Sequence, residues 1–266
     1  MIRVNPEVKF AYNLIKGSPQ ERREFVGNLN AKLFDSIELS MKGDMGSVES
    51  VKPILDTVLP EKKNIKVSTI PFSGDYDGSS SYIYDKKNEI IGQTLEIPAK
   101  KGKFTAKGLV AMMHEFTHPL STLANPKYTA RTIKLDRAHK YNFDYFKWYD
   151  KVLYTEKNGT SEADKKAHLD MVRNKTEKFL SGKSNEDKLD YIQDARYELE
   201  QERNAYEEQL KYAKILHSQK KQVYPTDLEN NNNIYMIPEK IAMLKQIGFD
   251  VVADIRSNLA KKSKKG

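Results

Sequence analysis

The most informative absence in this 266-residue sequence is cysteine, of which there is none. Without thiols the chain forms no disulfide, and it cannot build a zinc site from thiolates. Any metal must therefore be held by imidazole and carboxylate side chains. Because the sequence has only five histidines, the search for a metal site is a narrow one.

Long apolar runs are also missing. No stretch approaches the roughly 20 apolar residues that a membrane-spanning helix needs. The N-terminal sequence carries scattered charges where a secretory signal would have an apolar core. We therefore expect a protein that stays in the cytoplasm and has no membrane span.

The balance of charge is basic, with a net charge of +8, yet the 45 Lys and Arg are interleaved with 37 Asp and Glu along most of the chain. Interleaving of this kind is typical of a solvated surface. The one concentrated basic run lies at 261–266, where a solubilising tail is the favoured interpretation. Nucleic acid is therefore not the partner that we expect, although a phosphate-binding tail is the alternative.

Apolar periodicity predicts an α+β fold that is predominantly helical. A small, mostly antiparallel sheet is expected to pack on one central helix, which begins after Thr105, and a large helical part should follow. The simplest organisation is a single domain with a helical preface over 1–60, the sheet and central helix over 64–125, a helical subdomain over 126–260 and a basic tail over 261–266. The predicted strands cover 65–70, 80–84 and 89–98, the last with an irregularity at Gly92, and the other predicted helices cover 19–40, 48–59, 128–154, 161–180, 185–222 and 238–260.

The central helix contains the sequence His114-Glu115-Phe116-Thr117-His118, an HExxH pattern. Two histidines four residues apart lie on one face of a helix and can converge on one Zn²⁺ ion. Glu115 beside them can take a proton from the water that the metal activates and pass it to a leaving amine, as peptide hydrolysis requires. The surrounding helix is apolar, so burying two His and a Glu in it costs free energy unless a partner satisfies them. A bound metal ion would be such a partner. Pro119 predicts that the helix ends soon after the motif.

A catalytic zinc usually has three protein ligands, so the two histidines need a third. Glu202 is the favoured ligand, because it borders the apolar stripe of the helix predicted over 185–222 and is followed one turn later by the small Ala205. Glu198 is rotated about 40° further from this stripe and is the weaker choice. Glu162 is another alternative, since it ends a Gly-Thr-Ser-Glu sequence that resembles the Gly-Thr-x-Asp of aspzincins.

The remaining histidines, His139, His168 and His217, are isolated in helices rich in Lys and Asp, and we expect them to be exposed or at the edge of the core. An Asp-x-Asp-Gly sequence over 75–78 lacks most of the ligands of a calcium loop and predicts an ordinary turn. Hydrolysis also requires a donor to the tetrahedral oxyanion, and the sequence leaves this role open among Tyr206, Tyr212, His217 and Tyr224.

HEFTH followed by Glu202-Arg203-Asn204-Ala205 on a later helix resembles the gluzincin class of zincin (HExxH) zinc metallopeptidases, near the soluble ImmA/IrrE-type peptidases. The resemblance covers roughly residues 80–120 and 190–210. It implies a zincin-like fold, a Zn²⁺ cofactor, and a protein or peptide substrate that lies along an edge strand, here 93–98. One departure is Tyr206, which stands where related membrane-bound peptidases often have Asp.

Two other hypotheses remain beside a zinc-dependent endopeptidase. In the first, the HExxH pattern is coincidental or degenerate, and the basic helical body is a non-enzymatic interaction or nucleic-acid-binding protein. In the second, zinc is structural, and a further side chain such as Glu198 closes the water position.

Overall fold

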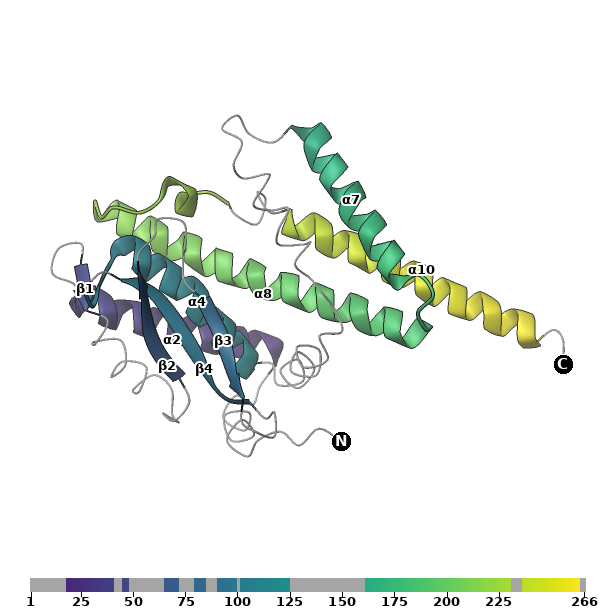
Figure 1. Ribbon diagram of the computed structural model, residues 1–266, viewed down its shortest axis with the longest axis horizontal. Helices are drawn as coiled ribbons and strands as arrows, with labels where there is room; N and C mark the ends of the chain where they lie inside the picture. Colours follow the sequence, from purple (N-terminus) through teal and green to yellow (C-terminus); the bar gives the residue numbers. More distant parts are fainter. Residues whose placement is uncertain are drawn as a thin grey trace. The chain divides into compact units, whose positions relative to one another are not determined.

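The computed structural model describes residues 18–40, 45–47, 65–71, 79–84, 90–99, 101–124, 161–230 and 236–263. This part of the chain is predominantly helical, with short strands near the N-terminal side (Figure 1). The helices predicted over 48–59 and 128–154 lie outside the described residues. So do His139, the turn predicted over 75–78 and the last residues of the basic tail.

The chain divides into two compact units. The first comprises Met1–Arg137 and Asn204–Asn231, and the second comprises Ala138–Arg203 and Asn232–Gly266. Helix α8 (Asn185–Ser218) contributes to both, because it runs unbroken through the boundary. The organisation as a single domain stays a prediction.

The first unit begins its described part with α2 (Pro19–Ser40), whose bounds confirm the predicted helix. Its buried side chains recur at helical spacing and form one stripe. They are Val26, Leu29, Asn30, Leu33, Phe34 and Ile37. All but Asn30 are apolar, so among the side chains that the structure describes α2 buries a hydrophobic face with one polar member.

Three strands form a sheet in the order β2-β4-β3. The predicted hairpin is confirmed: β3 (Ser79–Tyr84) and β4 (Ile90–Ala99) pair antiparallel, and the register shifts beside Gly92. Strand β2 (Ile65–Pro71) pairs with the other side of β4 in parallel orientation. A separate antiparallel pair joins β1 (Met45–Ser47) to β5 (Lys103–Thr105).

The sheet order corrects one expectation. The prediction that 93–98 forms an edge strand is wrong, because these residues belong to β4, which is hydrogen-bonded to a neighbour on each side. Its backbone groups are already used in the two ladders, so β4 has no free edge for a substrate. Strand alternation indicates where strands are but not which of them lies in the middle.

Helix α4 (Ala106–Ala124) follows β5 directly. The hydroxyl of Thr105 accepts a hydrogen bond of 3.3 Å from the N–H of Gly108, which confirms the predicted N-cap. α4 packs on β3 and β4 and against α2 (Figure 1). The helix continues for five residues beyond Pro119 and ends at Ala124, within two turns of the motif. A proline removes one hydrogen bond of the ladder, and the bonds on either side maintain the helix.

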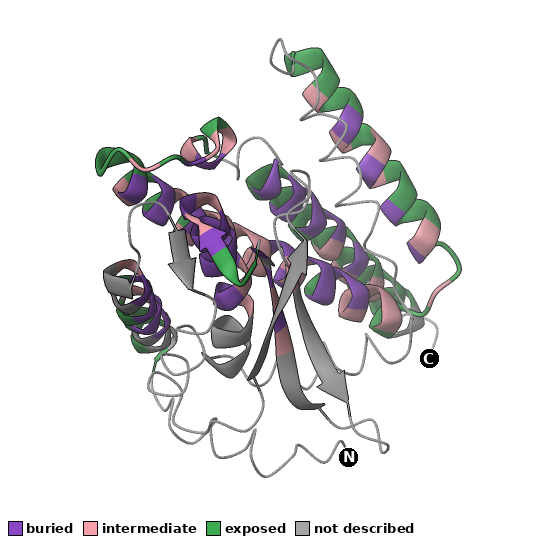
Figure 2. Ribbon diagram, turned by 60° about the vertical axis from the view of Figure 1, so that its left-hand side comes forward, coloured by how far each residue is buried: buried purple, intermediate pink, exposed green. Residues whose placement is uncertain are grey.

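The second unit contains α7 (Glu162–Leu180), the first part of α8, and α10 (Ile237–Ser263). A capping box starts α7, since Ser161 and Asp164 exchange hydrogen bonds, and Gly182 with φ of 75° follows its end. The bands of buried and exposed residues along the helices in Figure 2 show their amphipathic character. Residues 238–260 form part of the single helix α10.

After α8 the chain turns back through a short 3₁₀ helix, η1 (Pro225–Leu228). The buried Asp227 accepts a hydrogen bond of 2.8 Å from Gln209 of α8 and one of 3.3 Å from the N–H of Tyr224. These bonds fix the turn to the second half of α8. Among the described residues, no helix is long and apolar enough to cross a bilayer.

Candidate metal centre

The described part of helix α4 is buried on most of its circumference, and His114, Glu115 and His118 lie on its least buried side. Met112, Met113 and Phe116 are almost completely inaccessible, whereas Glu115 and His118 are partly exposed. His118 and Glu115 lie about 40° and 100° round the helix from His114, so these three polar side chains occupy one arc. The core therefore holds the helix while this arc remains available for chemistry.

The two imidazoles of the motif lie close together. The ring centroids of His114 and His118 are 5.2 Å apart with an interplanar angle of 73°. His114 is 9% exposed, at the limit of full burial, and His118 is more accessible. This arrangement confirms that the four-residue spacing brings both rings to one place on the helix.

The part of α8 from Asn204 onward belongs to the first unit and lies beside α4. The ring of Tyr206 contacts the ring of His114 edge-on, with centroids 4.7 Å apart. Further along α8, Tyr212 stacks on Phe34 of α2 at 4.4 Å. Glu202 is one turn before Tyr206, so the same face of the helix brings its side chain toward the histidines. Ala205, between them, is completely buried, as a close helix approach requires.

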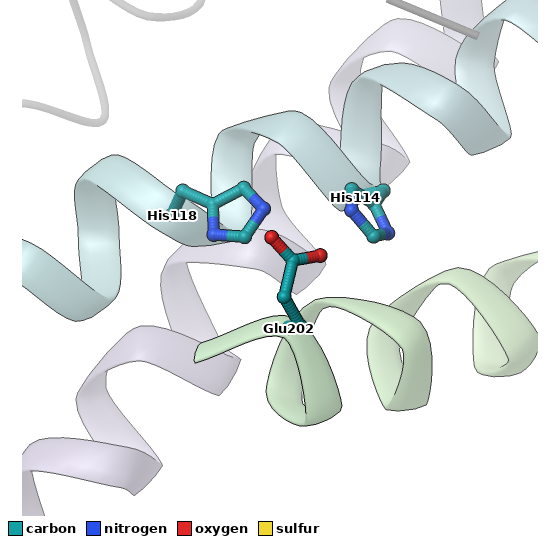
Figure 3. Close-up of side chains that lie close together, drawn as sticks. All are labelled: His114, His118 and Glu202. Carbon is teal, nitrogen blue, oxygen red and sulfur yellow. The ribbon is translucent and has the colours of Figure 1, made fainter. Parts of the chain in front are cut away.

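The carboxylate of Glu202 completes a group that could hold a metal ion. One ligand atom from each of His114, His118 and Glu202 lies within 4.8 Å of the other two. Figure 3 shows the carboxylate rising from α8 toward both imidazoles on α4. The structure thus brings together the three candidate ligands that the sequence favours.

The donor set suits zinc. Zinc–nitrogen and zinc–oxygen bonds are about 2.0–2.2 Å long, so two ligand atoms of one tetrahedral ion are about 3.4 Å apart. The three ligand atoms lie within 4.8 Å of one another, so side-chain rotations would have to bring them closer for an ion to bind. Two neutral imidazoles and one carboxylate also match the ligands that catalytic zinc takes, and three ligands leave one position for water.

Of the four candidate oxyanion donors, Tyr206 contacts a residue of the metal site, because its ring packs against that of His114. Tyr212 and His217 lie about 15 Å and 22 Å from Glu202 along the axis of α8, too far to reach an oxyanion at this group. Burial and then the charge of Glu208 raise the pKa of the Tyr212 hydroxyl. Tyr224 packs under the ammonium group of Lys107, which is 4.0 Å from its ring centroid.

The alternative ligands are not part of the group. Glu198 is partly buried on α8, one turn before Glu202 and therefore about 6 Å further along the helix. Glu162 is exposed in the first turn of α7, where its carboxylate pairs with Lys165 at 2.7 Å. His168 is buried in the second unit, and burial followed by the charge of Lys240 lowers its pKa to about 4.

Two residues near the site have no role in the sequence-based prediction. Asn30 of α2 and Thr117 of the HExxH motif are completely or almost completely buried, and a hydrogen bond of 3.1 Å joins them. Thr117 falls at a position that the motif leaves unspecified. The available signal was the place of Asn30 within an otherwise apolar helical stripe, since a polar residue there needs a partner.

Comparison with known proteins identifies no relative: no family model, no curated protein and no solved structure matches this chain.

Proposed function

We propose that this protein is a zinc-dependent peptidase with a zincin-like, gluzincin-type site. His114, His118 and Glu202 are its metal ligands, and Glu115 is its general base. The observation that carries the proposal is the convergence of three ligand atoms from two helices within 4.8 Å of one another. Glu115 belongs to the same arc of α4 as the histidines, next to the position where water would bind.

The chemistry divides between metal and protein. Bound zinc would polarise the scissile carbonyl and lower the pKa of a water molecule. The Glu115 carboxylate accepts a proton from that water and then delivers it to the leaving amine. The partial burial of Glu115 keeps the carboxylate at the boundary between core and solvent, where a substrate can reach it.

The substrate backbone is best placed along β3. Its neighbour β4 is the central strand of the described three-stranded sheet, and β3 and β2 are the two edge strands of that sheet. Of these two, β3 is the strand that packs on α4, the helix of the metal ligands. An extended peptide could pair with such an edge through main-chain hydrogen bonds, which suits a peptidase because these bonds do not depend on side chains.

Tyr206 is the proposed donor to the oxyanion. Replacing it by Phe should lower kcat by about 100-fold with little change in KM or zinc content, because the hydroxyl acts on charge that develops in the transition state. Steady-state kinetics together with metal analysis would measure this. Tyr212→Phe, which removes a hydroxyl from the same helix, should change kcat by less than about twofold. An unchanged kcat in Tyr206→Phe would exclude the role.

The proposal as a whole is tested on the purified chain. We expect about one zinc per chain and hydrolysis of an unfolded protein, and removal of the zinc by a chelator should stop hydrolysis until zinc is restored. Absence of zinc, together with salt-sensitive binding to a polyanion, would support the non-enzymatic hypothesis in its place. Zinc held by four protein ligands, seen by anomalous diffraction, would make the metal structural.

A further inference from the structure

We infer that Asn30 of α2 is a positioning residue for the metal-binding turn of α4. Its side-chain amide donates a hydrogen bond of 3.1 Å to the hydroxyl of Thr117. That hydroxyl in turn donates one of 2.8 Å to the main-chain carbonyl of Met113. The inference rests on the proposed function, because it assigns Asn30 a purpose in metal binding.

The two bonds act on the turn that carries both histidines. Met113 immediately precedes His114, and Thr117 immediately precedes His118. Each member of the hydrogen-bonded pair is about 100° round the helix from the histidine that follows it. The bond from Asn30 attaches α2 to α4 at Thr117, and the bond from Thr117 to Met113 fixes the direction of the accepting hydroxyl. This attachment therefore restrains the rotation of α4 about its axis, and with it the direction of the two imidazoles toward α8.

Packing alone would not set this rotation sharply. The residues around Asn30 on α2 are apolar, and apolar contacts are non-directional, so they allow α4 to rotate or slide by small amounts. A hydrogen bond weakens steeply when its distance or angle changes, and a buried one has no water to replace it. Metal ligands must lie within about 0.5 Å of the positions that the ion requires. A directional hydrogen bond to the turn that carries them helps to keep them there.

The burial of Asn30 argues against a role in stability alone. Its side chain is 0% exposed, and its carbonyl oxygen meets no hydrogen-bond donor among the described residues. A buried acceptor without a donor destabilises the fold relative to an apolar side chain of similar size. In Asn30→Leu this acceptor disappears, while the Thr117 hydroxyl can still donate to Met113. The substitution should therefore leave the stability of the metal-free protein equal or higher.

The experiment compares three variants of the full chain with the wild type. Asn30→Leu removes the donor, and Thr117→Val removes the hydroxyl. Thr176→Val is the matched control, because the buried Thr176 makes the same 2.8 Å bond to the carbonyl four residues earlier, in α7 of the second unit. Zn²⁺ affinity is measured by competition with a chromophoric chelator, and thermal unfolding and amide hydrogen exchange are measured on metal-free protein.

Asn30→Leu and Thr117→Val should each lower zinc affinity about tenfold, at the weaker end of what support behind metal ligands contributes. The double variant should lose no more zinc affinity than either single variant, because both substitutions remove the same hydrogen bond between Asn30 and Thr117. Thr176→Val should stay within about twofold of wild type. In metal-free Asn30→Leu, the melting temperature should not fall, yet the amides of residues 114–118 should exchange faster.

Two results would overturn the inference. The first is a wild type that binds zinc while Asn30→Leu binds it with unchanged affinity. The second is unchanged exchange of amides 114–118 in metal-free Asn30→Leu, which decides the matter even if the chain holds no zinc. Loss of peptidase activity is not used as a readout. A failure of the proposed function, in which the wild type binds zinc but hydrolyses nothing, is therefore distinguishable from a failure of this inference.

Discussion

Replacing Glu115 by Gln should lower kcat/KM for peptide hydrolysis by about 10³-fold while the protein keeps its zinc. The carboxamide has nearly the same shape as the carboxylate but cannot accept the proton from water, and general-base catalysis contributes about 10²–10⁴-fold. A loss of 10³ corresponds to about 4 kcal/mol of transition-state stabilisation. Steady-state kinetics and metal analysis on the same preparation would measure both quantities.

Glu207→Gln is the matched control for this substitution. Glu207 is an exposed glutamate on α8 and lies next to Tyr206 in sequence, so the same change of charge occurs near the site without altering the proposed base. Its kcat/KM should stay within about twofold of wild type. Retention of full activity by Glu115→Gln would remove Glu115 from the mechanism, and loss of its zinc would indicate that Glu115 is a ligand.

Replacing any of the three ligands by Ala should lower zinc affinity by at least about 10³-fold. Replacing a residue that only hydrogen-bonds to a metal ligand lowers metal affinity 10- to 100-fold, and losing a direct bond to the metal lowers it further. His114→Ala, His118→Ala and Glu202→Ala should therefore be purified with little zinc and should hydrolyse nothing. Competition with a chelator would measure the affinities. Full zinc occupancy after replacing both histidines would contradict the assignment of the site.

The choice of the third ligand can be tested separately. Glu198→Ala changes a glutamate one turn from Glu202 on the same helix, and Glu162→Ala changes the exposed glutamate of α7. Both should keep zinc affinity within a fewfold of wild type, because neither belongs to the group of close ligand atoms. If Glu198→Ala lost the metal and Glu202→Ala kept it, the two assignments would have to be exchanged. His217→Ala, at the exposed end of α8, is the control for the histidine substitutions.

Local chemistry made the helix boundaries predictable. The Thr105 cap of α4 and the apolar stripe of α2 each depend on residues a few positions apart, and the structure confirms them. The behaviour at Pro119 was not predictable in the same way. A proline disfavours the helix locally, whereas hydrogen bonds on both sides of it decide whether the helix continues.

Strand pairing was less predictable, because it joins residues that are distant in sequence. The hairpin of β3 and β4 is a local connection, and it was found. The parallel pairing of β2 with β4, which places β4 in the centre of the sheet, follows from no local pattern. The edge that we propose for a substrate is therefore β3 and not 93–98.

The sequence by itself determined that any metal must be held by His and carboxylate, and that His114 and His118 share one helical face. Both conclusions follow from composition and from the fixed geometry of a single helix. Only the tertiary structure decided that the Glu202 carboxylate lies close to these imidazoles and that Asn30 donates a hydrogen bond to Thr117. These contacts join residues more than 80 positions apart, and packing between helices determines such distances, which no spacing along the chain encodes.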